Sequence, residues 1–168
     1  MNRFISFICL LQCLLLSHEL YAGDKINGRL FHIERSKNKN IVCYDVVVNS
    51  KGKLDSQNPV NVYWINREES FGKQDKLSYI QQKSAYGYSI IEQNEKTANI
   101  VLNACKDKVV EIVKTDDSYI AKTLINKQKC VLTKIYVKTL PTNSLKVEYV
   151  ELYGVDSKNK SVSERIYN

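Results

Sequence analysis

The segment LFHIERSKNKNIVCYDVVV, residues 30–48, contains the most informative strand pattern of the chain. Apolar side chains recur at every second position on both sides of the polar segment SKNKN. This pattern is typical of two half-buried strands joined by a turn. Phe31 and Ile33 mark the apolar face of the first strand, and Val42 and Tyr44 mark that of the second. The stretch therefore predicts an antiparallel hairpin that contributes one face to a hydrophobic core.

The register of this hairpin follows from matching the two apolar faces. A slip of one residue would turn every side chain of a strand to the opposite face. The apolar positions are odd-numbered in the first strand and even-numbered in the second, so the match requires an even-length loop in the polar segment. His32 is then predicted opposite Asp45, and Glu34 opposite Cys43, on the face that points away from the core.

The chain that follows repeats this alternation between polar turns. We expect strands at 29–36, 41–48, 60–66, 87–93, 97–105, 109–114, 119–125, 130–139, 145–153 and 162–167. The segment QDKLSYIQQKSAYG differs, because Leu77 and Ile80 recur near helical spacing. It predicts one short helix over about 75–86, capped by Asp75 and stopped by Gly87. The fold class predicted is all-β, an antiparallel β-sandwich or barrel of about 8–10 strands with one short helix.

The N-terminus predicts export. The positively charged start MNR precedes the apolar run FISFICLLQCLLL, and Ala22 offers a small residue for cleavage. The run is shorter than the roughly 20 apolar residues that span a bilayer. We expect residues 1–22 to be a signal peptide and residues 23–168 to be a single β domain in the periplasm or cell envelope. Acylation of Cys13, as in a lipoprotein, is the alternative.

Charge and cysteine content narrow the function classes. The chain has 25 Lys and Arg against 18 Asp and Glu, a net charge of +7. The basic residues are spread over turns without a recognisable motif, so we expect no nucleic-acid partner, and we expect no transmembrane segment in the mature chain. Cys43, Cys105 and Cys130 indicate either buried free thiols or one disulfide. No cysteine or histidine spacing suggests a metal site, and we expect no cofactor.

The polar face of the first hairpin is one candidate site. It places His32 near two carboxylates, Glu34 and Asp45. A histidine beside a carboxylate is suited to general-base catalysis, but the same group also forms an ordinary cross-strand pair on a solvated face. In either case the carboxylate is expected to raise the pKa of His32 above its usual value of about 6.5. Catalytic residues cannot be assigned from this pattern.

The stretch NPVNVYWINREES holds the other candidate residues. Val60, Val62 and Trp64 share one strand face, while Tyr63 and Arg67 share the other. If the valines face the core, Trp64 is a core residue and not a ligand platform. Tyr63 and Arg67 then lie on the outer face, and both residue types are common in binding sites.

Several longer segments of the sequence resemble a family of exported bacterial proteins known as domain of unknown function 4833. The segments are FHIERSKNKNIVCYDV, NPVNVYWI, LSYIQQKSAYGY and SLKVEYVELYG, and they extend over most of the chain. The resemblance implies a stand-alone domain behind a signal peptide in a Gram-negative bacterium, and it implies no activity. Residues within these segments are the ones to test: His32, Glu34, Arg35, Tyr63 and Trp64.

Together these observations predict an exported, non-catalytic binding module for an envelope ligand or protein of unknown identity. One alternative is a hydrolase-type enzyme that uses His32 with Asp45 or Glu34, which requires these groups in a cleft. Another alternative is a calycin-like carrier of a small apolar ligand. That alternative requires an internal apolar cavity of about 300–1,000 Å³.

Overall fold

The computed structural model describes residues 28–116 and 118–167, and they form a mostly β structure. The predicted signal peptide, with Cys13, lies outside the described residues. The strands are β1 (Arg29–Arg35), β2 (Asn38–Val46), β3 (Val60–Ile65), β4 (Gln74–Lys76), β5 (Tyr88–Gln93), β6 (Thr97–Leu102), β7 (Cys105–Lys114), β8 (Tyr119–Ile125), β9 (Gln128–Leu140), β10 (Asn143–Val155) and β11 (Ser161–Tyr167). No helix within these residues is long and apolar enough to cross a membrane. The predicted fold class is confirmed, and each of the ten predicted strands corresponds to one of these eleven.

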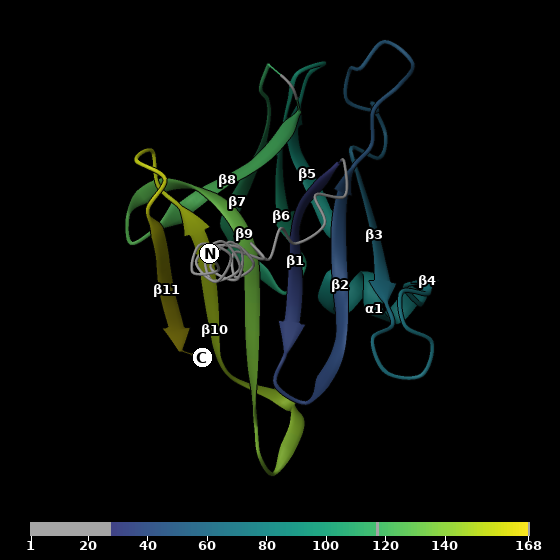
Figure 1. Ribbon diagram of the computed structural model, residues 1–168, viewed down its shortest axis with the longest axis vertical. Helices are drawn as coiled ribbons and strands as arrows, with labels where there is room; N and C mark the ends of the chain where they lie inside the picture. Colours follow the sequence, from purple (N-terminus) through teal and green to yellow (C-terminus); the bar gives the residue numbers. More distant parts are fainter. Residues whose placement is uncertain (1–27, 117, 168) are drawn as a thin grey trace, which may run out of the picture.

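All eleven strands belong to one strongly curled half-barrel sheet (Figure 1). The order is β4-β3-β2-β1-β9-β8-β7-β6-β5, and β10 pairs with both β9 and β11. Along one edge, β9 pairs first with β8 and then, through residues 134–137, with β1. Its other edge pairs with β10. The β1–β9 pair is parallel, so the sheet is mixed, whereas the sequence predicted an antiparallel arrangement.

The core lies on the concave face of the sheet. Phe31 and Tyr44 are almost fully buried, and their rings stack with centroids 4.4 Å apart. Trp64 packs against the same core beside Val60 and Val62, as predicted. Aromatic stacking adds to the hydrophobic gain of burying these rings.

The first hairpin has the predicted faces but not the predicted register. His32 pairs with Cys43, and Asp45 pairs with Arg29. The cause is the turn, which lies just before Asn38, so that β2 begins inside the polar segment. A shift of two residues keeps every side chain on its own face. The prediction of which side chains face the core is therefore confirmed, whereas the predicted pairing of His32 with Asp45 is wrong.

The helix is shorter than predicted. It comprises α1 (Tyr79–Gln81) and a π-helical turn, η1 (Gln82–Tyr86). Asp75 lies in β4, and the N-cap is Ser78, which forms a capping box with the end of α1. Gly87 follows the helix in an extended conformation, not in the left-handed one expected. Glycine is required there because a Cβ atom would lie 2.0 Å from the carbonyl oxygen of Gln82.

Candidate functional site

Three of the predicted site residues meet on the convex face of the sheet. The Nε2 atom of His32 lies 3.3 Å from Oε1 of Glu34. The Glu34 carboxylate also forms ion pairs with Arg67, at 3.8 Å, and with Lys134, at 3.3 Å. Lys134 was not predicted, because it reaches the group only through the parallel pairing of β9 with β1. The result is a small, partly exposed charge cluster.

The other two predicted residues, Asp45 and Tyr63, belong to a separate network. Asp45 accepts hydrogen bonds from Nε of Arg29 and from the Tyr63 hydroxyl. Tyr63 is only 6% exposed, because it packs with Ile41 and Cys43 in a second small apolar cluster. Burial, and next the hydrogen bond to Asp45, raise the pKa of Tyr63 to about 12. The network therefore holds β1, β2 and β3 together, and Tyr63 is not a surface platform.

The protonation of the first cluster differs from the prediction. Burial lowers the pKa of His32 below its usual value, against the opposing effect of Glu34. Burial alone would raise the pKa of Glu34, but Lys134 and His32 together lower it. A neutral imidazole beside an ionised carboxylate therefore prevails at neutral pH. The expected increase in the His32 pKa is wrong. The carboxylate partner of His32 is Glu34, and the lowering of the pKa by burial is larger than the increase that Glu34 causes.

We expect NMR titration of His32 to show a pKa below about 6.5. Glu34→Gln should lower it further, because that carboxylate favours the imidazolium. Asp45→Asn is the matched control and should leave the His32 pKa almost unchanged, since Asp45 binds Arg29 and Tyr63. An increase with Glu34→Gln would contradict the pairing.

The lowered pKa also fixes the sign of a pH effect on stability. The unfolded chain binds the His32 proton more tightly than the folded chain does. The stability that depends on neutral His32 is complete above the unfolded pKa of about 6.5, and it is lost as pH falls through that value towards the folded pKa. His32→Gln should flatten the stability curve in this window, as measured by urea unfolding.

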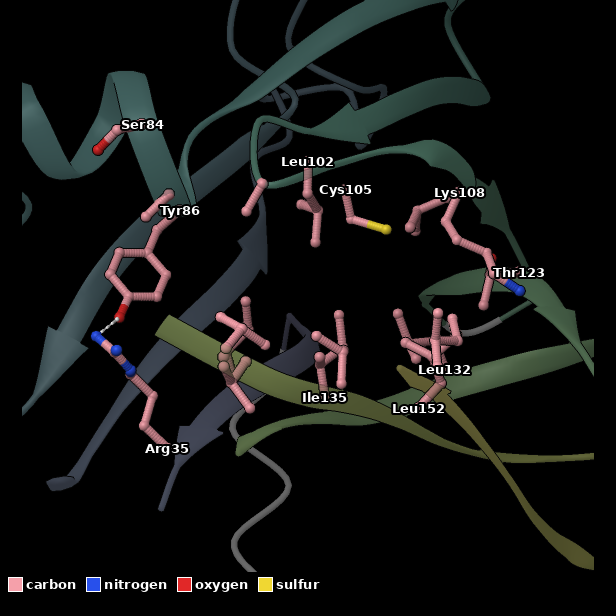
Figure 2. A pocket seen from close by; sticks show the side chains of 18 of the residues that line it. Arg35, Ser84, Tyr86, Leu102, Cys105, Lys108, Thr123, Leu132, Ile135 and Leu152 are labelled. Carbon is pink, nitrogen blue, oxygen red and sulfur yellow. Dashed lines mark hydrogen bonds between the residues drawn. The ribbon is translucent and has the colours of Figure 1, made fainter. Parts of the chain in front are cut away.

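A cavity of about 350 Å³ lies inside the half-barrel (Figure 2). Strands β1, β9, β10 and β11 line one side, and β6, β7, β8 and the end of the helix line the other. Most of the lining is apolar: Ile33, Ala85, Leu102, Ala104, Val110, Leu132, Ile135, Val137, Leu145, Val147, Val150, Leu152 and Ile166. The sheet is curled but not closed, and its core side chains do not fill this space.

An irregularity in β10 contributes to the lining. The register between β9 and β10 shifts between Val147 and Tyr149. Such a bulge changes which residues face inward. Val147 and Val150, an odd and an even position, therefore both line the cavity. Strict alternation along the sequence would have assigned them to opposite faces.

Polar groups lie at the two ends of the cavity, as Figure 2 shows. At one end Arg35 donates from Nη1 to the hydroxyl of Tyr86, at 3.2 Å, and from Nη2 to the carbonyl oxygen of Ser144, at 2.9 Å. At the other end Lys108 forms an ion pair with Glu164, at 2.9 Å. These side chains are the polar boundary of an otherwise apolar space.

Arg35 was named as a residue to test but was not among the predicted binding residues, although the sequence contains a signal for it. It follows Phe31 and Ile33 at the same spacing, so it occupies the core face of β1. An arginine on an apolar strand face needs a polar partner or a ligand. Tyr86, its partner, comes from the helix, and that contact could not be predicted from the sequence.

Cys43, Cys105 and Cys130 are free thiols in the structure, which agrees with the first of the two predicted alternatives and not with a disulfide. Cys43 and Cys130 are buried, and Cys105 lines the cavity. Burial raises the pKa of Cys43 to about 11, so it is a thiol at neutral pH. Within residues 28–116 and 118–167, no group of three or more His, Cys, Asp or Glu side chains is placed to hold a metal ion.

Comparison with known protein families gives a match over most of the chain. A family model described as a domain of unknown function, DUF4833, matches residues 31–165. No curated protein and no solved structure matches the chain. The family match confirms the resemblance seen in the sequence segments, and it assigns no activity to any residue.

Proposed function

The chain belongs to the DUF4833 family, and for this member we propose a non-catalytic function in which the half-barrel binds a small, mainly apolar ligand. The observation that carries this proposal is the cavity of about 350 Å³ with its apolar lining. Ligand pockets typically enclose about 300–1,000 Å³ and combine apolar walls with a few polar groups. Transfer of hydrocarbon from water into such a site is favourable, by about 25 cal/mol per Å² of apolar surface.

This proposal combines the binding module and the carrier alternatives. The hydrolase alternative has less support, because His32 and Glu34 lie on the convex face and neither lines the cavity. Asp45 is already engaged by Arg29 and Tyr63. A general base needs a substrate within hydrogen-bond reach, and none of the described residues that line the cavity is a histidine, an aspartate or a glutamate.

We further propose that the protein acts in the periplasm or cell envelope. The support is the signal-peptide pattern of residues 1–22. The chain isolated from a periplasmic fraction should begin near Gly23 on N-terminal sequencing. An intact Met1 in that fraction would contradict export with cleavage, and a lipid on Cys13 would indicate the lipoprotein alternative.

A neutral fluorescent probe tests the cavity. N-phenyl-1-naphthylamine should bind the protein saturably with enhanced fluorescence, since its rings transfer from water to an apolar wall. Val150→Trp places a large ring in the cavity and should weaken binding at least about tenfold, roughly 1.4 kcal/mol. The matched control is Val109→Trp, because Val109 is 45% exposed and does not line the cavity.

The two variants distinguish specific binding in the cavity from non-specific hydrophobic binding to the protein surface. Circular dichroism and thermal unfolding must show that both variants remain folded. Equal binding by both variants and the wild type would place the probe on the surface. Absence of saturable binding to the wild type would overturn the proposed function.

A further inference from the structure

We propose that the ligand of the cavity is an amphiphile with an alkyl chain and an anionic head, and that Arg35 and Tyr86 bind the head. This inference rests on the proposed function and adds the chemical class of the ligand. The alkyl chain of the ligand would lie along Ile135, Leu132 and Leu152, which extend from the Arg35 end towards the far end of the cavity (Figure 2).

The first argument is the charge of Arg35. The ion pairs among the described residues involve other basic side chains, and none of the described carboxylates pairs with Arg35. Its two hydrogen-bond partners, the Tyr86 hydroxyl and the Ser144 carbonyl oxygen, are neutral. A guanidinium is charged at every physiological pH. An apolar cavity therefore ends at a positive charge that no described side chain neutralises.

The second argument is that the two neutral partners hold Arg35 in place. Tyr86 is buried, and its ring meets Trp64 edge to face at a centroid distance of 5.2 Å. The backbone of Ser144 belongs to β10, which forms another wall of the cavity. A guanidinium has five N–H donors, and these two bonds leave others available. The Tyr86 hydroxyl accepts from Arg35, so its own proton is available to a ligand oxygen.

The third argument is the asymmetry of the cavity. Lys108, at the opposite end, is neutralised by Glu164 and also donates to the carbonyl oxygen of Leu124. The two ends therefore differ in net charge although both carry a basic side chain. An anionic head is favoured at the Arg35 end, because a guanidinium donates charge-assisted hydrogen bonds to an anion and these are stronger than bonds between neutral groups.

Carboxylate and phosphate heads share the required chemistry, since both accept hydrogen bonds from a guanidinium. The test is displacement of N-phenyl-1-naphthylamine by four compounds with the same chain: dodecanoate, dodecyl phosphate, dodecanol and dodecyltrimethylammonium. At least one anion should displace the probe about tenfold better than dodecanol, as expected for hydrogen bonds to a charged group. The cationic compound should be the weakest. The better anion identifies the head.

Variants assign the preference to Arg35. Arg35→Gln should abolish the advantage of the anions and leave the affinity for dodecanol almost unchanged. Lys37→Gln is the matched control, because Lys37 lies near Arg35 in sequence, donates to the Pro141 carbonyl oxygen and does not line the cavity. It should retain the anion preference. Thermal unfolding checks that each variant is folded.

The outcomes distinguish the two proposals. If dodecanoate, dodecyl phosphate and dodecanol displace the probe equally from the wild-type protein, the proposal of an anionic head is wrong. The proposal that the cavity binds an apolar ligand is then unaffected. The same holds if the probe binds and no dodecyl compound displaces it. If the probe itself does not bind, the proposed function falls and this inference falls with it. The wild-type comparison is decisive even where Arg35→Gln fails to fold.

Discussion

Replacing Tyr44 with alanine should lower the free energy of unfolding by about 3–5 kcal/mol, the usual effect of removing a buried aromatic ring. The Tyr44 side chain is 0% exposed and stacks on Phe31. Its hydroxyl donates to the backbone carbonyl oxygen of Tyr86 at 2.6 Å, so it also ties β2 to the helix. Burial raises the pKa of Tyr44, which keeps this donor protonated. The loss is a large share of the 5–15 kcal/mol typical of a domain.

Two further variants separate the contributions at this position. Tyr44→Phe retains the ring and leaves the Tyr86 carbonyl oxygen without its donor, which should cost about 1–3 kcal/mol. Phe71→Ala is the control for loss of an aromatic ring, because Phe71 is 87% exposed, and it should change stability by less than about 0.5 kcal/mol. Urea unfolding measures all three. A near-neutral Tyr44→Ala would contradict the described core.

The second large effect is expected at Gly87, where the chain leaves the helix. An alanine Cβ would lie 2.0 Å from the carbonyl oxygen of Gln82, and that oxygen already accepts bonds from the Gly87 amide and from Asn103. The backbone must therefore move. We expect Gly87→Ala to cost about 3 kcal/mol, at the upper end of the range for overpacking. It should also weaken probe binding, because Ala85 and Tyr86 line the cavity.

The control for this change is in the same helical turn. Lys83 has an exposed side chain, so Lys83→Ala should change stability by less than about 0.5 kcal/mol and should leave probe binding intact. Thermal unfolding and probe titration of both variants provide the comparison. A Gly87→Ala protein with wild-type melting and wild-type probe affinity would show that the helix end is not fixed as described.

The strands could be predicted because alternation is a local property of the chain. In the first hairpin it assigned Phe31 and Tyr44 correctly to the core face. It could not fix the turn, because SKNKN contains no glycine or proline that would select one turn position. The two-residue error in register follows from this. The parallel pairing of β1 with β9 could not be predicted either, since no local sequence pattern links segments that are so far apart in the chain.

The candidate site could be predicted only where it depended on strand faces. His32, Glu34 and Arg67 do lie together, because all three are on the convex side. Asp45 and Tyr63 do not join them, because the true register brings Asp45 to Arg29. The cavity was a stated alternative but could not be located. It depends on the curl of the sheet and on the bulge in β10, which break the alternation that the prediction used.

The double role of β9 has a consequence for how the chain folds. Its pairings with β8 and β10 join neighbours in sequence, whereas its pairing with β1 closes a loop of roughly 100 residues. Contacts that close long loops form slowly, so the β5–β11 meander is expected to assemble first and the β1–β2 hairpin to dock last. β1 supplies Ile33 and Arg35 to the cavity. The cavity is therefore completed only in that final step, and a ligand that requires it would slow unfolding without accelerating folding.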